Sequence, residues 1–298
     1  MPTDCLETLL HPNTGEMWDP LHHAAAAGYP EIVKILLEAG AHMDTQDIHE
    51  ATPLHHAAKG QRVAEGAYGE TVKTLLEAGA HIDAEDMHGE TALHYAAKGG
   101  LSDVVAVLLE AGCHKSPVSL HRAVACGRLD VVHLLIAAGV PHAADEAGIT
   151  PLFQAASYGY EGIVRALLES GAPIDAPTDS GWTPLHGACH PGHLQVVQAL
   201  LEAGADKELA ENQGRRPLHL AAELDHLKVL RLLLEAKSDT AAVDAMCRTP
   251  LHIAAQHGHV RSARVLLAAR GQKEALDSDG RTPWQVARDN DRIMELLL

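Results

Sequence analysis

The sequence predicts an all-α chain, a solenoid of about nine helix–turn–helix repeats that stack side by side with hairpin loops projecting from the stack. The first observation is a Pro-Leu-His motif that recurs with variants, mostly at a spacing of 33 residues. A fixed period of this size is typical of repeat proteins, in which each repeat buries its apolar face against its neighbours. The proline position is held in turn by Pro20, Pro53, Ala92, Ser119, Pro151, Pro184, Pro217, Pro250 and Pro283.

The first helix of each repeat is expected to begin at this motif. In the second copy, the hydroxyl of Thr52 can accept a hydrogen bond from a free backbone N–H group at the start of a helix. Pro53 follows at the first helical position, where its missing N–H group costs nothing. Leu54, Ala57 and Ala58 share one face of this helix, so we expect them in the core.

A second helix should follow in each repeat. Residues 31–38 carry apolar side chains at helical spacing, and Gly40 stands where a helix C-terminus favours glycine. The polar residues 41–51 are too broken for a helix and predict a hairpin that leads to the next Thr-Pro pair. The same glycine returns at Gly79, Gly112, Gly139, Gly171 and Gly204.

Two spacings depart from the period. A spacing of 39 residues places about six extra residues within 60–69, between the two helices of the second repeat. A spacing of 27 residues removes six residues between Gly112 and Ser119, where most of a hairpin should lie. We therefore expect two groups of hairpins, one from repeats one to three and one from repeats five to nine.

These motifs resemble the ankyrin repeat family over nearly the whole chain. Residues 14–298 form the expected array, with residues 1–13 as an N-terminal flank or partial cap. The resemblance implies a curved stack that binds other proteins through the concave groove of its first helices and through its hairpin tips, without catalysis. The repeats are expected to start near residues 14, 47, 86, 113, 145, 178, 211, 244 and 277.

Composition excludes several classes of function. The formal charge of −17 argues against a nucleic-acid or anionic-membrane binder, and aromatic residues, at 3%, are too few for base-stacking platforms. No apolar run is long enough for a membrane span. The five cysteines form no CxxC pair, which favours a cytoplasmic or nuclear protein. We expect a monomer without a cofactor.

Histidine is abundant, with 22 copies. The family resemblance implies that the motif histidine forms structural hydrogen bonds between neighbouring turns. A shared zinc site is disfavoured, because equivalent residues on packed helices lie about 8–10 Å apart, whereas zinc ligands must converge to within roughly 3–4 Å. We expect no metal and no catalytic residue, and we expect buried or structural thiols. The motif histidines are His22, His55, His94, His121, His186, His219 and His252.

The candidate site is a stripe along the later repeats. The position before the motif threonine is Trp182, Arg215, Arg248 and Arg281 in the last four repeats. Arg and Trp are typical interface anchors, so we predict that the stripe recognises an extended acidic segment of a partner protein. In the alternative interpretation, the arginines pair with acidic residues in adjacent hairpins, namely Asp244, Asp277 and Asp279. Nearby candidates are Tyr158, Pro191, Leu224 and His257 on the first helices, with Gln213 and Met246 on the hairpins.

The predicted function is therefore a recognition module, adaptor or scaffold that binds a partner protein through repeats five to nine. Replacing the three arginines by Glu should weaken binding and leave thermal stability nearly unchanged. Three alternatives stay open. One is a regulatory ankyrin domain of a larger signalling, channel or ubiquitin-ligase protein. Another is a metal- or small-ligand-binding enzyme that uses groove histidines and Cys189, and the third is a pH-responsive binder.

Overall fold

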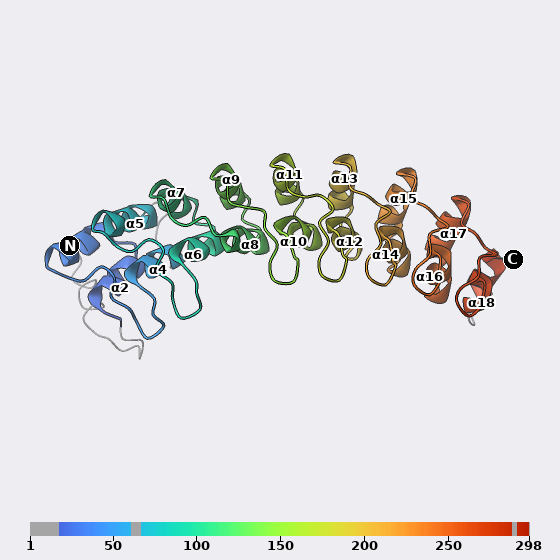
Figure 1. Cartoon of the computed structure of the whole chain (residues 1–298), viewed down its shortest axis with the longest axis horizontal. Coiled ribbons are helices and arrows are strands. Elements are labelled where there is room, and N and C mark those ends of the chain that lie inside the picture. Colours follow the sequence, from blue (N-terminus) through green and yellow to red (C-terminus); the bar gives the residue numbers. More distant parts are fainter. Residues whose placement is uncertain (1–17, 61–66, 288–290, 298) are drawn as a thin grey trace. The chain divides into compact units, whose positions relative to one another are not determined.

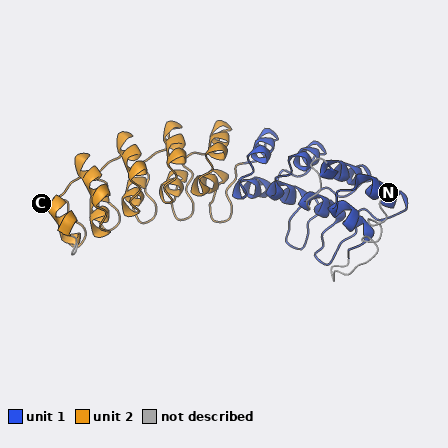
Figure 2. Cartoon of the chain, turned by 180° about the vertical axis from the view of Figure 1, so that it is seen from behind, with its two compact units in different colours: residues 1–141 blue, residues 142–298 orange. Residues whose placement is uncertain are grey.

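The computed structural model describes residues 18–60, 67–287 and 291–297, and the regular elements of these residues are all α-helices. The chain divides into two compact units, Met1–Pro141 (unit 1) and His142–Leu298 (unit 2) (Figure 2). The expected N-terminal flank, residues 1–13, lies outside the described residues.

Unit 1 contains four helix pairs (Figure 1) among its described residues. The first helices of successive repeats pack on one another, as do the second helices. The first helices are α2 (Pro20–Ala26), α4 (Pro53–Lys59), α6 (Ala92–Gly99) and α8 (Pro117–Ala125). The second helices are α3 (Pro30–Glu38), α5 (Ala67–Glu77), α7 (Ser102–Glu110) and α9 (Leu129–Ala137).

Unit 2 repeats the same arrangement in its described residues, again with each layer of helices packed along the stack. The first helices are α10 (Pro151–Tyr158), α12 (Pro184–Cys189), α14 (Pro217–Glu223), α16 (Pro250–Gln256) and α18 (Pro283–Val286). The second helices are α11 (Glu161–Glu169), α13 (Leu194–Glu202), α15 (Leu227–Glu235), α17 (Val260–Ala268) and α19 (Asp291–Leu297).

The core lies between the helix layers and is built from the motif. The leucine after the proline position is at most 2% exposed in the first eight repeats, and the small residues one turn later, mostly alanines, are also buried. Since alanine adds little bulk, neighbouring first helices pack closely while the leucines fill the space between layers. Ile293 and Leu297 of the last helix are buried as well. The buried motif leucines include Leu21, Leu54, Leu93, Leu120, Leu152, Leu185, Leu218 and Leu251.

Two predicted boundaries need correction. Helix α8 begins at Pro117, two residues before the aligned position Ser119, because the side chain of Ser116 caps an extra N-terminal turn. Helix α5 begins at Ala67, so the last three residues of the expected insertion are helical, and Tyr68 is buried. The rest of that insertion, residues 61–66, lies outside the described residues.

Each hairpin loop, called a finger below, joins a second helix to the first helix of the next repeat. Residues 111–116, between α7 and α8, form only a short turn where the other repeats have a finger. The finger row of unit 1 is therefore interrupted there, as the 27-residue spacing predicted.

Candidate partner-binding surfaces

A buried acidic residue closes the turn of several fingers. In one finger of unit 2, Asp244 Oδ1 accepts hydrogen bonds from the backbone N–H groups of Met246 and Arg248, both at 2.9 Å. The next finger has the same arrangement, with Asp277 Oδ1 accepting from Asp279 at 3.0 Å and Arg281 at 2.8 Å. Short acidic side chains satisfy turn N–H groups in this way, and they fix the backbone of the residue at the base of the finger.

The base residues of four fingers in unit 2 form a row, called the finger-base row below. Its members are Trp182, Arg215, Arg248 and Arg281, each immediately before the N-cap residue of α12, α14, α16 or α18. The Cζ atom of Arg215 lies 5.9 Å from the centroid of the Trp182 ring. The fold therefore gives these predicted residues equivalent positions, one in each of four successive repeats.

Every arginine of the row is paired with acidic groups. Arg248 Nη2 lies 2.7 Å from Asp244 Oδ2, and Arg281 Nη2 lies 2.9 Å from Asp277 Oδ2 and 2.7 Å from Asp279 Oδ2. The sequence named these three carboxylates as partners, but it placed them in adjacent fingers, which is wrong. Arg248 and Arg281 pair with these carboxylates within their own fingers, four or fewer residues away.

The pairing occupies the edges of the guanidinium groups. Arg215 donates from Nε to Glu211 at 3.1 Å and from Nη1 to Glu223 at 3.2 Å. Arg248 donates from Nη1 to Gln256 Oε1 at 3.1 Å in addition to its Asp244 bond. An acidic partner would therefore have to compete with these groups for the arginine N–H donors.

The other predicted site residues are exposed on the same unit. Tyr158, at the end of α10, is 53% exposed, and Met246, on a finger, is 57% exposed. Gln213 is also exposed on its finger, and its carbonyl oxygen accepts from Ala245 N in the next finger at 2.9 Å. The His257 ring stacks on His259 with centroids 5.8 Å apart. Unit 2 thus presents both apolar and polar side chains beside the finger-base row.

The motif histidines form a structural ladder, as the resemblance implied. His55 Nε2 donates to the carbonyl oxygen of Glu90 at 3.0 Å, and His186 Nε2 donates to that of Arg215 at 3.1 Å. In each case Nδ1 accepts from the backbone N–H of the residue at the N-cap position, Thr52 or Thr183. The ring is therefore neutral, with its proton on Nε2, and it joins one repeat to the finger base of the next.

Burial opposes protonation of this ladder. It lowers the pKa of His55, His186 and His252, and it lowers the pKa of His219 to about 4. A charged imidazolium would lose the acceptor role of Nδ1. Among the described residues there is also no group of three or more His, Cys, Asp or Glu side chains placed to hold a metal ion.

The thiols fall into two classes. Cys113 and Cys189 are buried, and burial raises the pKa of Cys113 to about 11 and that of Cys189 further. A buried thiol of raised pKa is a poor nucleophile, which disfavours the chemistry considered for Cys189. Cys126 and Cys247 are exposed, so the expectation of buried or structural thiols does not hold for these two as far as burial is concerned. Cys5 lies outside the described residues.

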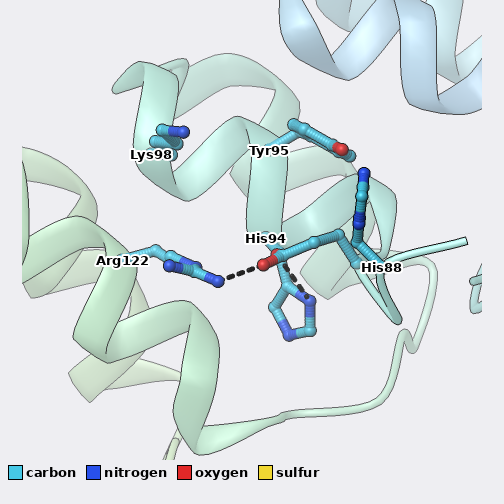
Figure 3. Close-up of a pocket in the computed structure, with 6 residues that line it drawn as sticks. His88, His94, Tyr95, Lys98 and Arg122 are labelled. Atoms are coloured by element: carbon cyan, nitrogen blue, oxygen red, sulfur yellow. Dashed lines mark hydrogen bonds and ion pairs between the residues drawn. The ribbon is translucent and has the colours of Figure 1, made fainter. Parts of the chain in front are cut away.

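Unit 1 contains a polar cleft that the sequence analysis missed. It has a volume of about 340 Å³ and lies beside the missing finger (Figure 3). Glu90 pairs with Arg122 and lies 3.3 Å from His94 Nδ1. Lys59 of α4 and Lys98 of α6 occupy the same position relative to their motifs, and Arg122 follows on α8. This succession of basic residues on neighbouring helices is the sequence signal that could have revealed the cleft. The lining residues are His88, Glu90, His94, Tyr95, Lys98 and Arg122.

His94 differs from the other ladder histidines. Its Nδ1 accepts from the backbone N–H of Thr91 at 3.1 Å, but its buried Nε2 has no hydrogen-bond partner. His55, one repeat earlier, donates to a finger-base carbonyl, and no finger follows α7. The missing finger explains the unpartnered nitrogen.

The paired helices, fingers and histidine ladder define a helical repeat protein. The chain belongs to the ankyrin repeat family. A model described as ankyrin repeats in three copies matches residues 2–86, 21–119, 120–211 and 174–244, and a single ankyrin repeat matches residues 246–277.

Two curated relatives match part of the chain. Protein phosphatase 1 regulatory subunit 27 of Homo sapiens is 48% identical over 62 residues, which cover 20% of this chain and 40% of that protein. The Mus musculus protein of the same name is 47% identical over 62 residues. The chain thus spans about two fifths of the length of these relatives. No helix in the described part of the chain is long and apolar enough to cross a membrane.

Proposed function

We propose that this chain is a protein-recognition module, an adaptor or scaffold that holds an extended segment of a partner protein against the fingers and first helices of unit 2. The observation that carries the proposal is the finger-base row, which offers one large side chain per repeat at equivalent positions. An extended segment can contact such a row repeatedly, since both are periodic along one direction.

The chemistry of the row favours a particular kind of segment. An acidic segment, as the sequence predicted, has to compete with Glu211, Asp244 and Asp277 for the arginine N–H groups. The Trp182 ring and the exposed Met246 side chain instead suit apolar and aromatic side chains. We therefore assign to unit 2 a segment that is rich in such residues.

Affinity capture tests this proposal. The intact chain and the Tyr158→Ala/Met246→Ala variant are used to capture proteins from a native lysate, followed by quantitative mass spectrometry. A protein captured by the intact chain and reduced about tenfold by the variant supports the proposal, because interface anchors each contribute roughly 1–2 kcal/mol or more. Equal capture by both chains contradicts it.

A matched control variant tests whether the loss of capture is specific to the surface of unit 2. The Ile35→Ala/Leu129→Ala variant removes exposed apolar side chains of similar size from the second-helix layer of unit 1. It should capture the same protein as the intact chain does. Loss in both variants points to a general change in stability or adhesiveness and contradicts a site on unit 2.

A second candidate function is regulation of a protein phosphatase. It rests on the 62-residue match to protein phosphatase 1 regulatory subunit 27. The chain is titrated into purified protein phosphatase 1, and the phosphatase activity and the complex mass are both measured. A stable complex with altered activity supports this candidate, and the absence of a complex at micromolar concentrations contradicts it.

A further inference from the structure

Three basic side chains lie on successive first helices of unit 1. They are Lys59 at the end of α4, Lys98 near the end of α6 and Arg122 in α8. Lys59 Nζ lies 4.3 Å from the centroid of the Tyr95 ring. Lys98, Tyr95 and Arg122 line the cleft together with His88, Glu90 and His94 (Figure 3).

The carboxylates around this cleft already form hydrogen bonds or ion pairs with other groups of the chain. Asp86 is buried and accepts from the hydroxyl of Tyr95 at 2.5 Å and from the backbone N–H groups of His88 at 2.9 Å and Glu90 at 3.1 Å. The side chain of Glu90 pairs with Arg122. Among the described residues, Lys59 and Lys98 form no ion pair with a carboxylate. Within the described residues, the ammonium group of Lys59 over the Tyr95 ring and that of Lys98 in the cleft lining thus have no bound counter-charge.

The local charge contrasts with its surroundings. Acidic residues outnumber basic ones in the chain as a whole, 40 to 23, and most of this excess lies in residues 1–149. In unit 2, by comparison, the arginines of the finger-base row are neutralised by carboxylates of their own fingers. In the described part of unit 1, by contrast, Lys59 and Lys98 lack such a carboxylate partner, so charge complementarity favours an anionic ligand beside them.

We propose that unit 1 binds an acidic, extended segment of a protein partner in and beside this cleft, with the partner's carboxylates accepting hydrogen bonds from Lys59 and Lys98 and competing with Glu90 for Arg122. One cation on each of three neighbouring helices matches an extended chain, which presents side chains in succession. A small organic ligand fits the cleft less well, because such ligands need mostly apolar walls and this cleft is lined mainly by polar side chains. This site is separate from the surface proposed for unit 2.

A labelled acidic peptide tests the proposal. Fluorescein-labelled octaglutamate is titrated with the full chain at low ionic strength, and binding is followed by fluorescence anisotropy. The Lys59→Gln/Lys98→Gln variant should bind about fivefold more weakly, as expected for the loss of two exposed ion pairs. The Glu90→Gln variant should bind about threefold more tightly, since it removes a competing carboxylate from Arg122. Tighter binding by Glu90→Gln could not be caused by a folding defect, because a less well folded variant would bind more weakly.

The matched control is Lys34→Gln/Lys73→Gln, which removes the same charge from exposed lysines on α3 and α5. It should change the affinity by less than about twofold. Equal weakening in both lysine double variants, or no binding by the intact chain, overturns the proposal. Inorganic phosphate should compete only weakly, because one phosphate ion does not span three helices. Competition by phosphate at the same concentration of anionic groups as the peptide overturns the assignment to a protein segment.

Discussion

His219 Nε2 lies 3.2 Å from the carbonyl oxygen of Arg248, which is one repeat further along the chain. The same residue, Arg248, directs its side chain to the surface of unit 2 and pairs with Asp244. Backbone and side chain thus have different roles at this position. The backbone carbonyl joins two repeats, and the side chain forms part of the candidate binding surface.

Replacing the ladder histidine should be costly. In His219→Leu, the backbone N–H of Arg216 and the carbonyl of Arg248 lose their partner, and each buried unsatisfied group costs about 1–3 kcal/mol. His94→Leu is the matched control, because His94 Nε2 has no partner to lose. Chemical denaturation at pH 7 should show a free energy of unfolding lower by about 1 kcal/mol or more in His219→Leu than in His94→Leu. Equal free energies would rule out the ladder as a stabilising feature.

Lowering the pH should destabilise the fold at pH values above those at which its carboxylates become protonated. The pKa of His219 and that of His56 are lowered by burial to about 4, whereas an unfolded histidine has a pKa near 6.5. Between these values the unfolded chain binds more protons than the native chain, so stability rises with pH and falls as pH decreases. Melting temperatures measured from pH 7.5 to pH 5 should decrease steadily below about pH 6.5. A constant or rising melting temperature over this range would contradict the neutral ladder.

Replacing either of two residues in left-handed backbone conformations by glycine should stabilise the fold. Cys247 has φ 56° and Lys237 has φ 64°, at positions where other repeats carry glycine. Cys247→Gly and Lys237→Gly should each raise the free energy of unfolding by about 0.5–1 kcal/mol, because glycine adopts positive φ without steric cost. Thermal or chemical denaturation measures the change.

Asp225 provides the control for this effect. It has φ 54°, but its Oδ1 accepts from Ser262 Oγ at 2.6 Å. Asp225→Gly should therefore gain less than the other two variants, since it also loses this hydrogen bond. A gain of the same size at all three positions would show that the bond contributes nothing.

Charge reversal in the finger-base row should reduce stability. Asp244 is only 2% exposed at its side chain, so Arg248→Glu places a second carboxylate against a buried one. Arg248→Gln keeps a hydrogen-bond donor and adds no charge. We expect a lower melting temperature for Arg248→Glu than for Arg248→Gln. Identical melting temperatures would support the sequence-based expectation that reversal leaves stability nearly unchanged.

Helix positions could be predicted well because their signals are local. A threonine followed by proline caps and starts α4, α10, α12, α16 and α18, and this needs no knowledge of distant residues. At α8 the same reasoning placed the start two residues late, since the alignment followed Leu120 and His121. There the hydroxyl of Ser116 supplies the cap instead of a threonine at the usual position.

The surface chemistry could be predicted only in part. The finger-base row followed from the period, but the pairing of Arg248 with Asp244 depends on the turn of the finger, which brings residues four apart together. The cationic cleft depends on three helices meeting side by side. Lys59 and Lys98 are 39 residues apart in the sequence, and the intervening insertion hides their equivalence.

Hydrogen–deuterium exchange of the chain, free and bound to a protein obtained by affinity capture, tests the central claim most directly. The account predicts that partner binding slows exchange in residues 209–216, 242–249 and 275–282, at the fingers of unit 2. Protection confined to the second helices α11, α13, α15 and α17, or an unchanged exchange pattern throughout unit 2, would contradict it.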